Sequence, residues 1–419
     1  MNHCESAAIA DSARAAGLEV VEWGRKADYA VVNSCALTVL AEAKTRQAIR
    51  IFTRANPNSY VALVGCCAQT DPEKFAKIEN VKWVIATPAK AACVKIMLEN
   101  PAAENAQIFS APAPASPHSC ETPLTDRMNL KIQDGCDNAC SYCIIPRARG
   151  RPVSRDFDEI VGDARNMVRR GVREILLAGI NISKFSSPRG TLLDVIDALD
   201  AIPGLLRIRL GSIEPPEFFL DGLLERIADP SHKLAPHLHI SAQSLSDKVL
   251  QIMRRNYGAA EFLRLVEKIK SASEDISVGT DIICGHPGEG LEEFFQTESR
   301  LLESGVSYAH VFTFSPRPKT LAATMKDTPP PGERKARSDR LREVSREISD
   351  KFLSLQRGKI RRVLLENKLK NGEYLARTDN FIQVAVKIDA DGLKNRLADV
   401  EILGRGGIER AAARFVRLV

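Results

Sequence analysis

The sequence lacks any long apolar segment and any sign of a secretion signal. No apolar run approaches the roughly 20 residues that a membrane helix needs. The N-terminus, MNHCESAAIADSARAAG, has neither the basic start nor the apolar stretch of a signal peptide. We therefore expect a cytoplasmic protein, and the length of 419 residues predicts two or three domains.

The chain also has little net charge, only +6 at pH 7, but that charge is unevenly distributed. Residues 331–370 contain 13 Lys or Arg and 6 Asp or Glu. A local basic surface of this kind favours polyanions such as RNA. Neighbouring charges of opposite sign, such as Arg342 and Glu343, leave a solvated helix with ion pairs as the alternative.

The ten cysteines are expected to be metal ligands in a reducing compartment rather than a disulfide framework. Cys136, Cys140 and Cys143 form a C-x3-C-x2-C run within KIQDGCDNACSYCIIPRARG. Three thiolates at this spacing can hold three irons of a [4Fe-4S] cluster and leave the fourth iron for S-adenosylmethionine (SAM). A zinc knuckle is the alternative, but zinc sites mostly use C-x2-C pairs and a fourth Cys or His. No histidine lies near this loop.

Residues 1–98 alternate between helical and strand patterns, which predicts a parallel sheet covered on both faces. Cys35 and Cys66 each follow a predicted strand, at the edge where open α/β sheets place ligands. Residues 100–127, which include Cys120, are rich in Ala, Pro and Ser and are predicted to be a linker. The predicted strands are 29–33, 60–65 and 83–86, and the predicted helices are 6–16, 39–54 and 90–98.

A second series of strands and helices runs from residue 129 to about residue 325. Its six strands predict a partial (β/α)6 barrel with a site formed by the loops at the strand C-termini. The cysteine run follows the first of these strands. The strand candidates are 129–132, 174–178, 206–210, 237–240, 277–283 and 309–313, and the helices are 157–170, 192–201, 217–227, 259–271 and 291–303.

The C-terminal part begins with a long basic helix at 333–356. Alternating segments follow, with turns at Asn371-Gly372 and Asp391-Gly392, and they predict a small β-barrel of the OB-like size class that often binds RNA. The predicted fold class is therefore α/β, with a parallel-sheet domain, a partial barrel and a small β-barrel in that order. The alternating segments are 361–366, 374–377, 383–388 and 397–403.

Eight segments, in this order, resemble those of the radical-SAM methylthiotransferases over nearly the whole chain. The resemblance implies a methylthiotransferase domain at 1–99, a linker at 100–127, a radical-SAM domain at 128–355 and an RNA-binding TRAM domain at 356–419. KIQDGC followed by CIIPxARG is most similar to the branch that acts on N6-threonylcarbamoyladenosine at position 37 of tRNA, beside the anticodon. The segments are NHCESAAIA, VVNSCALT, LVGCCAQ, KIQDGCDNACSYCIIPRARG, RLGSIEPPEF, HLHISAQS, DIICGHPGE and HVFTFSPRPKT.

The resemblance also implies the chemistry. Reduction of the cluster on Cys136, Cys140 and Cys143 cleaves SAM to a 5′-deoxyadenosyl radical, which removes the hydrogen from C2 of the adenine. The cofactor supplies this reactivity, and the protein supplies position and exclusion of water. The implied partners are the anticodon loop of tRNA, an electron donor such as flavodoxin or ferredoxin, and a sulfur source.

Residues implied in cofactor binding lie in two further family motifs. The glycines after the strand at 277–283 permit close backbone approach, and Glu289 can accept hydrogen bonds from a ligand's amine or hydroxyl groups. Alone, this segment is more often an ordinary βα turn. The implied residues are Asp281, Gly285, Pro287, Gly288, Glu289, Gln243, Ser244 and Arg254.

Several neighbouring residues have two open interpretations. Arg254 and Arg255 suit the SAM carboxylate or a tRNA phosphate, since a guanidinium fork fits both, but a surface salt bridge is the alternative. His237 and His239 alternate on one predicted strand, where we expect satisfied buried histidines rather than ligands.

A second, auxiliary [4Fe-4S] cluster is implied, and it would carry the sulfur that is inserted. Cys35 and Cys66 match two of its three family ligands, but the third would fall two positions before Met1. We expect a start codon assigned too late, because a domain without its first strand exposes a sheet edge. Cys4 is the doubtful substitute ligand. Cys67, Cys93 and Cys284 are expected to be packing residues, Cys67 because it points to the opposite side of an extended chain.

Three alternatives stay open. In the first, the substrate is isopentenyladenosine in tRNA rather than threonylcarbamoyladenosine. In the second, the substrate is an aspartate of a ribosomal protein. The third alternative is a zinc-binding RNA-interaction protein without enzymatic activity, which metal analysis and visible absorption distinguish.

Overall fold

A computed structural model describes the chain except residues 1, 112–126, 216–219 and 408–409, so Cys120 lies outside the described residues. Contacts divide the chain into two compact units. Unit 1 combines residues 1–124 with 133–154 and 315–324, and unit 2 combines 125–132, 155–314 and 325–419. The cysteine run therefore belongs to the same unit as the N-terminal sheet.

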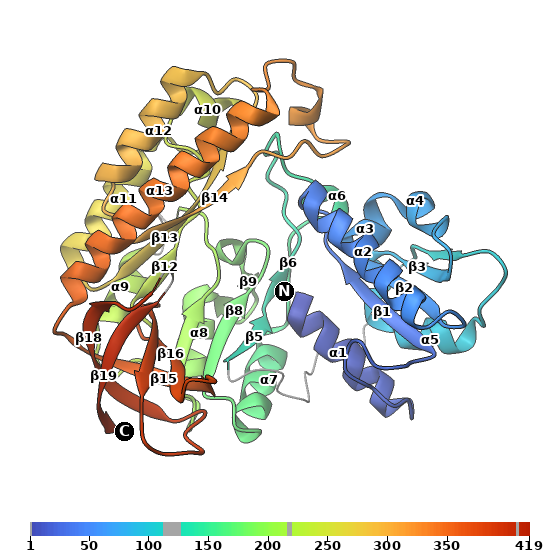
Figure 1. Ribbon diagram of the computed structural model, residues 1–419, viewed down its shortest axis with the longest axis horizontal. Coiled ribbons are helices and arrows are strands. Elements are labelled where there is room, and N and C mark those ends of the chain that lie inside the picture. Colours follow the sequence, from blue (N-terminus) through green and yellow to red (C-terminus); the bar gives the residue numbers. More distant parts are fainter. Residues whose placement is uncertain (1, 112–126, 216–219, 408–409) are drawn as a thin grey trace. The chain divides into compact units, whose positions relative to one another are not determined.

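Unit 1 is a parallel four-stranded sheet with helices on both faces (Figure 1). One apolar core contains Val32, Ile49 and Phe75 and the other contains Trp83 and Val94, so buried strands are covered on both sides as predicted. The strands are β1 (Tyr29–Ser34), β2 (Tyr60–Gly65), β3 (Val81–Ile85) and β4 (Gln107–Phe109). The helices are α1 (Asn2–Ala15), α2 (Val39–Ala55), α3 (Cys66–Thr70), α4 (Pro72–Ala76), η1 (Thr87–Ala92), α5 (Cys93–Glu99), α6 (Ile145–Arg149) and η3 (Leu321–Thr324).

One feature of unit 1 differs from the sequence prediction. Gln107–Phe109 pairs with β3 as strand β4, although the segment was predicted to be linker. The exposed fractions of its three side chains are intermediate or high, so it carries no apolar pattern that would reveal a strand. At the other side of the sheet, β1 pairs only with β2 among the described residues.

Unit 2 contains the six predicted parallel strands as two three-stranded sheets, in the orders β11-β8-β5 and β12-β13-β14. Isolated bridges from Ile208 to Leu234 and from Ile213 to Ile240 connect the sheets, which gives the predicted partial barrel. The strands are β5 (Arg127–Lys131), β8 (Glu174–Ala178), β11 (Arg207–Leu210), β12 (His237–His239), β13 (Ser277–Cys284) and β14 (Tyr308–Thr313). The helices are α7 (Phe157–Arg169), η2 (Ile182–Lys184), α8 (Leu192–Asp200), α9 (Leu220–Ala228), α10 (Asp247–Ile252), α11 (Ala259–Ala272), α12 (Leu291–Glu303) and α13 (Pro331–Gln356).

The C-terminal part of unit 2 is a closed barrel in the order β15-β16-β17-β19-β18. Four of its strands were predicted, but β19 was not, because half of its side chains are exposed, only one is buried, and it shows no apolar alternation. Short two-residue pairs complete the strands: β6 (Gln133–Asp134) with β7 (Val153–Ser154), and β9 (Ser186–Ser187) with β10 (Gly190–Thr191). The barrel strands are β15 (Ile360–Lys368), β16 (Glu373–Thr378), β17 (Gln383–Lys387), β18 (Leu397–Arg405) and β19 (Ala411–Leu418).

A buried ionic network attaches this barrel to the first sheet of unit 2. Glu174 on β8 accepts hydrogen bonds from Arg209 Nε at 2.7 Å and Arg207 Nη1 at 3.0 Å. The same guanidinium groups donate to backbone oxygens of the barrel, at Thr378 (2.6 Å) and Arg362 (3.0 Å). Buried charged side chains therefore fix the barrel to the sheet.

Among the described residues, no helix is both long and apolar enough to cross a membrane.

Candidate iron–sulfur and S-adenosylmethionine sites

The cysteine run is held in a loop closed by the β6–β7 pair. Gly135 comes directly before Cys136 and has φ of +72°, and a Cβ built there would lie 2.0 Å from the carbonyl oxygen of Arg151. Cys136 N also donates to Gly150 O at 3.0 Å. Only glycine fits at position 135, because both the backbone conformation and the close approach exclude a side chain.

Backbone N–H groups donate hydrogen bonds to two of the thiols in this loop, as is usual for cluster ligands. Asn138 N donates to Cys136 Sγ and Ile145 N donates to Cys143 Sγ, each at 3.4 Å. The three cysteines are half-buried, and no disulfide joins the cysteines that the structure describes. Hydrogen bonds to sulfur favour the thiolate that iron requires. The donor set therefore fits a three-cysteine cluster.

Cys35 and Cys66 lie together at the carboxyl edge of the N-terminal sheet. They follow β1 and β2, whose last residues, Ser34 and Gly65, are paired in register. Burial raises the pKa of Cys35, and the charge of Cys66 adds to that effect. The two thiols are neighbours at this edge of the sheet, and their role as cluster ligands stays a prediction.

The other cysteines of unit 1 differ in their surroundings. Cys67 is 1% exposed, its Sγ donates to Cys35 O at 3.2 Å, and burial raises its pKa to about 12. It packs in the core as expected, but it lies in α3 rather than in an extended segment. Cys93 is fully buried as expected. Cys4 lies half-buried in the first turn of α1.

Arg149 connects the surroundings of both cysteine sites, and sequence reasoning missed it. Its side chain is 3% exposed and pairs with Glu5 at 2.8 Å and with Asp134 at 3.1 Å. Burial opposes the charged guanidinium, but Glu5 and Asp134 outweigh that effect and raise its pKa, and Cys66 contributes in the same direction. Arg149 stands six residues after Cys143 on α6, which packs against α3. The arginine therefore places one positive charge beside the Cys35–Cys66 site.

The predicted SAM-binding segment follows β13 in unit 2. Gly285 and Gly288 have φ of +78° and +83°, and added Cβ atoms would lie 2.4 Å from Arg334 Cγ and 2.5 Å from Ile252 Cδ1. The glycines are therefore required by the turn itself. Pro287 lies between them, and its carbonyl oxygen is 2.8 Å from His286 Nδ1.

The carboxylate of Glu289 forms its contacts within this turn. Its Oε1 accepts from Gly285 N at 2.8 Å and lies 3.0 Å from Arg337 Nη1. Burial raises the pKa of Glu289 although Arg337 lowers it. Cys284 is fully buried beside Glu289, which agrees with its expected packing role. The carboxylate thus holds the loop, and its predicted contact with a ligand stays a prediction.

Gln243 is the predicted residue that the structure brings beside Asp281, through a bridge to β13. Gln243 N donates to Asp281 O at 2.7 Å, and Gln243 has φ of +65°. Ser244 is 1% exposed and contacts Thr297 Oγ1 at 3.3 Å, so it joins this segment to α12. Arg254 also has a positive φ, +58°.

Arg255 pairs with Glu214 at 3.0 Å, and the arginine side chain is only 6% exposed. The salt bridge that was one of its two interpretations is present but buried rather than on the surface.

A chain of polar side chains crosses β12, β13 and β14. Tyr308 Oη lies 2.8 Å from His237 Nε2 and 3.2 Å from His239 Nδ1. His239 Nε2 lies 3.1 Å and His310 Nδ1 3.4 Å from Asp281 Oδ1. Each buried histidine therefore has a partner in Tyr308, but His237 Nδ1 and His239 Nε2 have no hydrogen-bond partner among the described residues, so the two rings are only partly satisfied. Sequence reasoning missed that Tyr308 and His310 join them. The spacing of Tyr308 and His310 by two on a strand was the available signal.

Comparison with known proteins defines the class first. Residues 130–301 match the model of the Radical SAM superfamily, and residues 1–86 match Uncharacterized protein family UPF0004. A solved structure of the radical S-adenosylmethionine methyltransferase TsrM from Kitasatospora setae shares the fold. It has a TM-score of 0.51, 14% identity and coverage of 76% of this chain and 73% of that one. The protein is a radical-SAM protein.

The full-length relatives identify the family. The threonylcarbamoyladenosine tRNA methylthiotransferase MtaB of Bacillus subtilis is 33% identical over 100% of this chain and 95% of its own. The protein of the same name from Thermotoga maritima is 34% identical over 87% and 84%. A tRNA-2-methylthio-N(6)-dimethylallyladenosine synthase of Endomicrobium trichonymphae is 33% identical over 94% and 92%. The chain belongs to the radical-SAM methylthiotransferase family, and its cofactors include a [4Fe-4S] cluster and SAM.

Proposed function

We propose that this protein adds a methylthio group to C2 of N6-threonylcarbamoyladenosine at position 37 of tRNA. The observation that carries the proposal is the full-length similarity to proteins named for that reaction. The dimethylallyladenosine reaction is the second candidate, because relatives named for it are almost equally similar. Because its substrate is tRNA, we place the activity in the cytoplasm.

Two tRNAs test this choice. Anaerobic reconstituted protein is incubated with SAM, sulfide, a chemical reductant and tRNA that carries either modified adenosine. We expect the methylthio mass on threonylcarbamoyladenosine alone. Modification of isopentenyladenosine alone would replace the first candidate with the second. In cells, a small carrier such as flavodoxin or ferredoxin would supply the electrons.

Cys136, Cys140 and Cys143 are the proposed ligands of the SAM cluster. When bound, the cluster and SAM supply the radical that removes hydrogen from the adenine. The chain's own part is to hold three thiolates in a loop that glycine closes and that backbone N–H groups stabilise. Replacing Cys140 with serine should abolish SAM cleavage, whereas Cys93→Ser, in a buried thiol of α5, should leave it unchanged.

The auxiliary cluster is proposed to use Cys35 and Cys66, with a third ligand from a segment before Met1. An open groove of about 620 Å³ supports such a segment, because it runs along β1, whose outer edge has no partner strand in the part of the chain that the structure describes. Apolar side chains from α1, α5 and β1 line it, among them Ile9, Val31 and Met97. An apolar groove beside a free strand edge suits one more strand, which would end near Cys35.

Iron content tests this part. A version extended upstream of Met1 should bind about four more irons per chain than the version that starts at Met1. The extra iron should be lost with Cys35→Ser, but not with Cys4→Ser. If both versions bind the same amount of iron, and Cys4→Ser loses the iron of the auxiliary cluster, then Cys4 is the third ligand.

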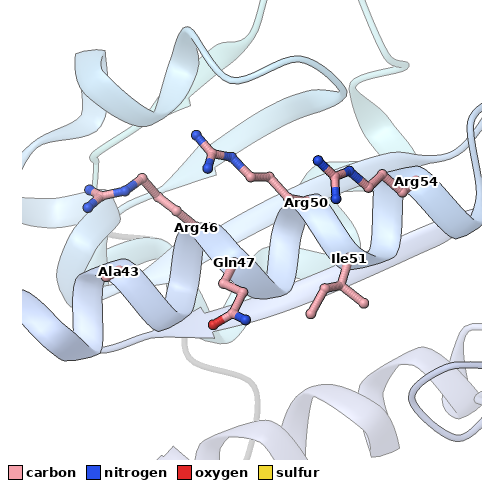
Figure 2. Close-up of a pocket in the computed structure, with 6 residues that line it drawn as sticks. All are labelled: Ala43, Arg46, Gln47, Arg50, Ile51 and Arg54. Atoms are coloured by element: carbon pink, nitrogen blue, oxygen red, sulfur yellow. The ribbon is translucent and has the colours of Figure 1, made fainter.

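Basic side chains on α2 are proposed to contact tRNA phosphates. Figure 2 shows Arg46, Arg50 and Arg54 in one row along an exposed face of this helix. Successive members are four residues apart, which is about 6 Å along a helix. The basic helix α13 and the C-terminal barrel are expected to bind RNA as well.

A charge reversal tests the α2 row. Arg50→Glu combined with Arg54→Glu should weaken tRNA binding and reduce the slope of log affinity against log salt by about 2. The control is Lys95→Glu on α5, where an exposed lysine pairs with Glu99. An unchanged salt slope in the double variant would remove α2 from the RNA surface.

A further inference from the structure

We propose that His239, Asp281 and His310 form a binding site for a divalent first-row metal ion, separate from the iron–sulfur sites. One ligand atom of each residue lies within 4.8 Å of the other two. The three residues stand on adjacent parallel strands, β12, β13 and β14, which lie side by side in Figure 1. Asp281 and His310 are direct partners in the strand register. Two imidazoles and one carboxylate are a common ligand set for zinc and for non-haem iron.

The distances between the ligand atoms suit a shared metal ion. Bonds of 2.0–2.1 Å in a tetrahedral site place neighbouring ligand atoms roughly 3.3 Å apart. The two separations from Asp281 Oδ1 are 3.1 Å to His239 and 3.4 Å to His310. Both values lie close to the tetrahedral edge, so one ion can reach all three atoms with small adjustments.

The surrounding hydrogen bonds orient the ligands as metal sites require. The Tyr308 hydroxyl lies 2.8 Å from His237 Nε2, and in one arrangement of its proton it donates to that nitrogen. Tyr308 Oη then accepts from His239 Nδ1–H at 3.2 Å. This leaves a lone pair on His239 Nε2, which is the tautomer that a metal ligand needs.

The second observation that supports the metal site is a ring nitrogen of His239 without a hydrogen-bond partner in the described chain. Its Nε2 is buried and has no hydrogen-bond partner, although Asp281 Oδ1 lies only 3.1 Å away. A buried nitrogen lone pair beside a carboxylate is unfavourable unless a proton or a metal ion lies between them, and a metal ion would satisfy both groups. Ser241 Oγ donates to the other oxygen of Asp281 at 3.1 Å and so fixes the carboxylate.

A ligand from solvent can reach the remaining coordination positions of the proposed metal ion. His310 is 55% exposed, and it lines a groove of about 330 Å³ together with Arg346 and Arg377. A cation beside two arginines suits a ligand with anionic oxygens, such as a carboxylate or a phosphate, or a water molecule in its absence. Asp281 was predicted from the sequence only as a neighbour of SAM, and this proposal gives its carboxylate a different ligand.

The test uses full-length protein with its clusters reconstituted anaerobically and Mn²⁺ as the probe. The intensity of the EPR signal of free Mn²⁺ measures how much has bound. We expect about one Mn²⁺ per chain, displaced by Zn²⁺, and binding at least tenfold weaker in His310→Gln and in Asp281→Asn. His232→Gln is the matched control, because His232 lies near the carboxylates of Asp197 and Asp200 at another site.

Two results would overturn the metal site: no bound Mn²⁺ in the unaltered protein, or equal binding in His310→Gln. Either would leave the three residues as a hydrogen-bonded ion pair only. If Asp281→Asn loses cluster iron, His310→Gln decides alone, since that side chain is exposed on an edge strand. The measurement needs neither tRNA nor SAM cleavage, so its failure is distinct from failure of the proposed function.

Discussion

Glu174→Gln should release the C-terminal barrel from the sheet of unit 2. Glu174 is 1% exposed and is the shared partner of Arg209, which is fully buried, and Arg207. Burial raises the pKa of Glu174, but the charges of Arg209 and Arg207 outweigh burial and lower it from 4.5 to about 2. That difference corresponds to about 3 kcal/mol in favour of the carboxylate. Removing one member of a buried ion pair costs about 3–5 kcal/mol, which agrees.

Hydrogen exchange measured by mass spectrometry reports this loss locally. The Asp379 amide, which donates to Arg362 O at 3.0 Å, lies where the arginines reach the barrel. Peptides of β15 and β16 should exchange about 10²–10³ times faster in Glu174→Gln, because each 1.4 kcal/mol is a factor of ten. The control is Asp197→Asn, which removes a half-exposed partner of Arg226 and should change exchange little. Equal protection in Glu174→Gln and the unaltered protein would refute the reasoning.

The same carboxylate makes the attachment sensitive to acid. Because its pKa is lower in the folded state, Glu174 stabilises the fold fully above its unfolded value of 4.5. That contribution is lost as the pH falls from 4.5 to about 2. Protection of β15 and β16 should therefore decline over this range in the unaltered protein, and Glu174→Gln should lack this decline.

Two further predictions concern unit 1. Gly135→Ala should lower cluster iron and SAM cleavage together, because the added Cβ meets Arg151 O at 2.0 Å, whereas the control Gly162→Ala on α7, which meets no atom within 4 Å and has no positive φ, should keep its iron. Iron analysis of both variants decides, and full iron in Gly135→Ala would contradict the loop geometry. Arg149→Met should leave Glu5 buried without its arginine partner and lower the free energy of unfolding by about 3 kcal/mol. The loss should appear as a lower midpoint of urea unfolding. An unchanged midpoint would show that the pair of Lys90 with Glu5 is sufficient for stability.

Much of the fold could be predicted because its strands are buried and its helices are amphipathic. The six barrel strands and the two-faced N-terminal sheet give clear periodic patterns. Strand β19 could not be predicted, because only one of its side chains is buried and it shows no apolar alternation. The short strand β4 was hidden for a similar reason within a segment of linker composition.

The candidate site was predictable where one type of residue carries the chemistry. The three cysteines of the loop could be recognised from their spacing, and their role stays a prediction. Arg149, Tyr308 and His310 could not be assigned, because their importance depends on partners far away in the sequence. Glu5, for instance, is 144 residues from Arg149. Long-range pairs of this kind are visible only in the folded chain.

The central claim is that the protein methylthiolates threonylcarbamoyladenosine of tRNA. The most direct measurement is mass spectrometry of tRNA nucleosides from cells that lack the gene, with the gene and its Cys140→Ser variant restored in turn. We predict that the 2-methylthio form of threonylcarbamoyladenosine disappears, returns with the unaltered gene and stays absent with the variant. Undiminished 2-methylthio-threonylcarbamoyladenosine in the deletion strain would contradict the account.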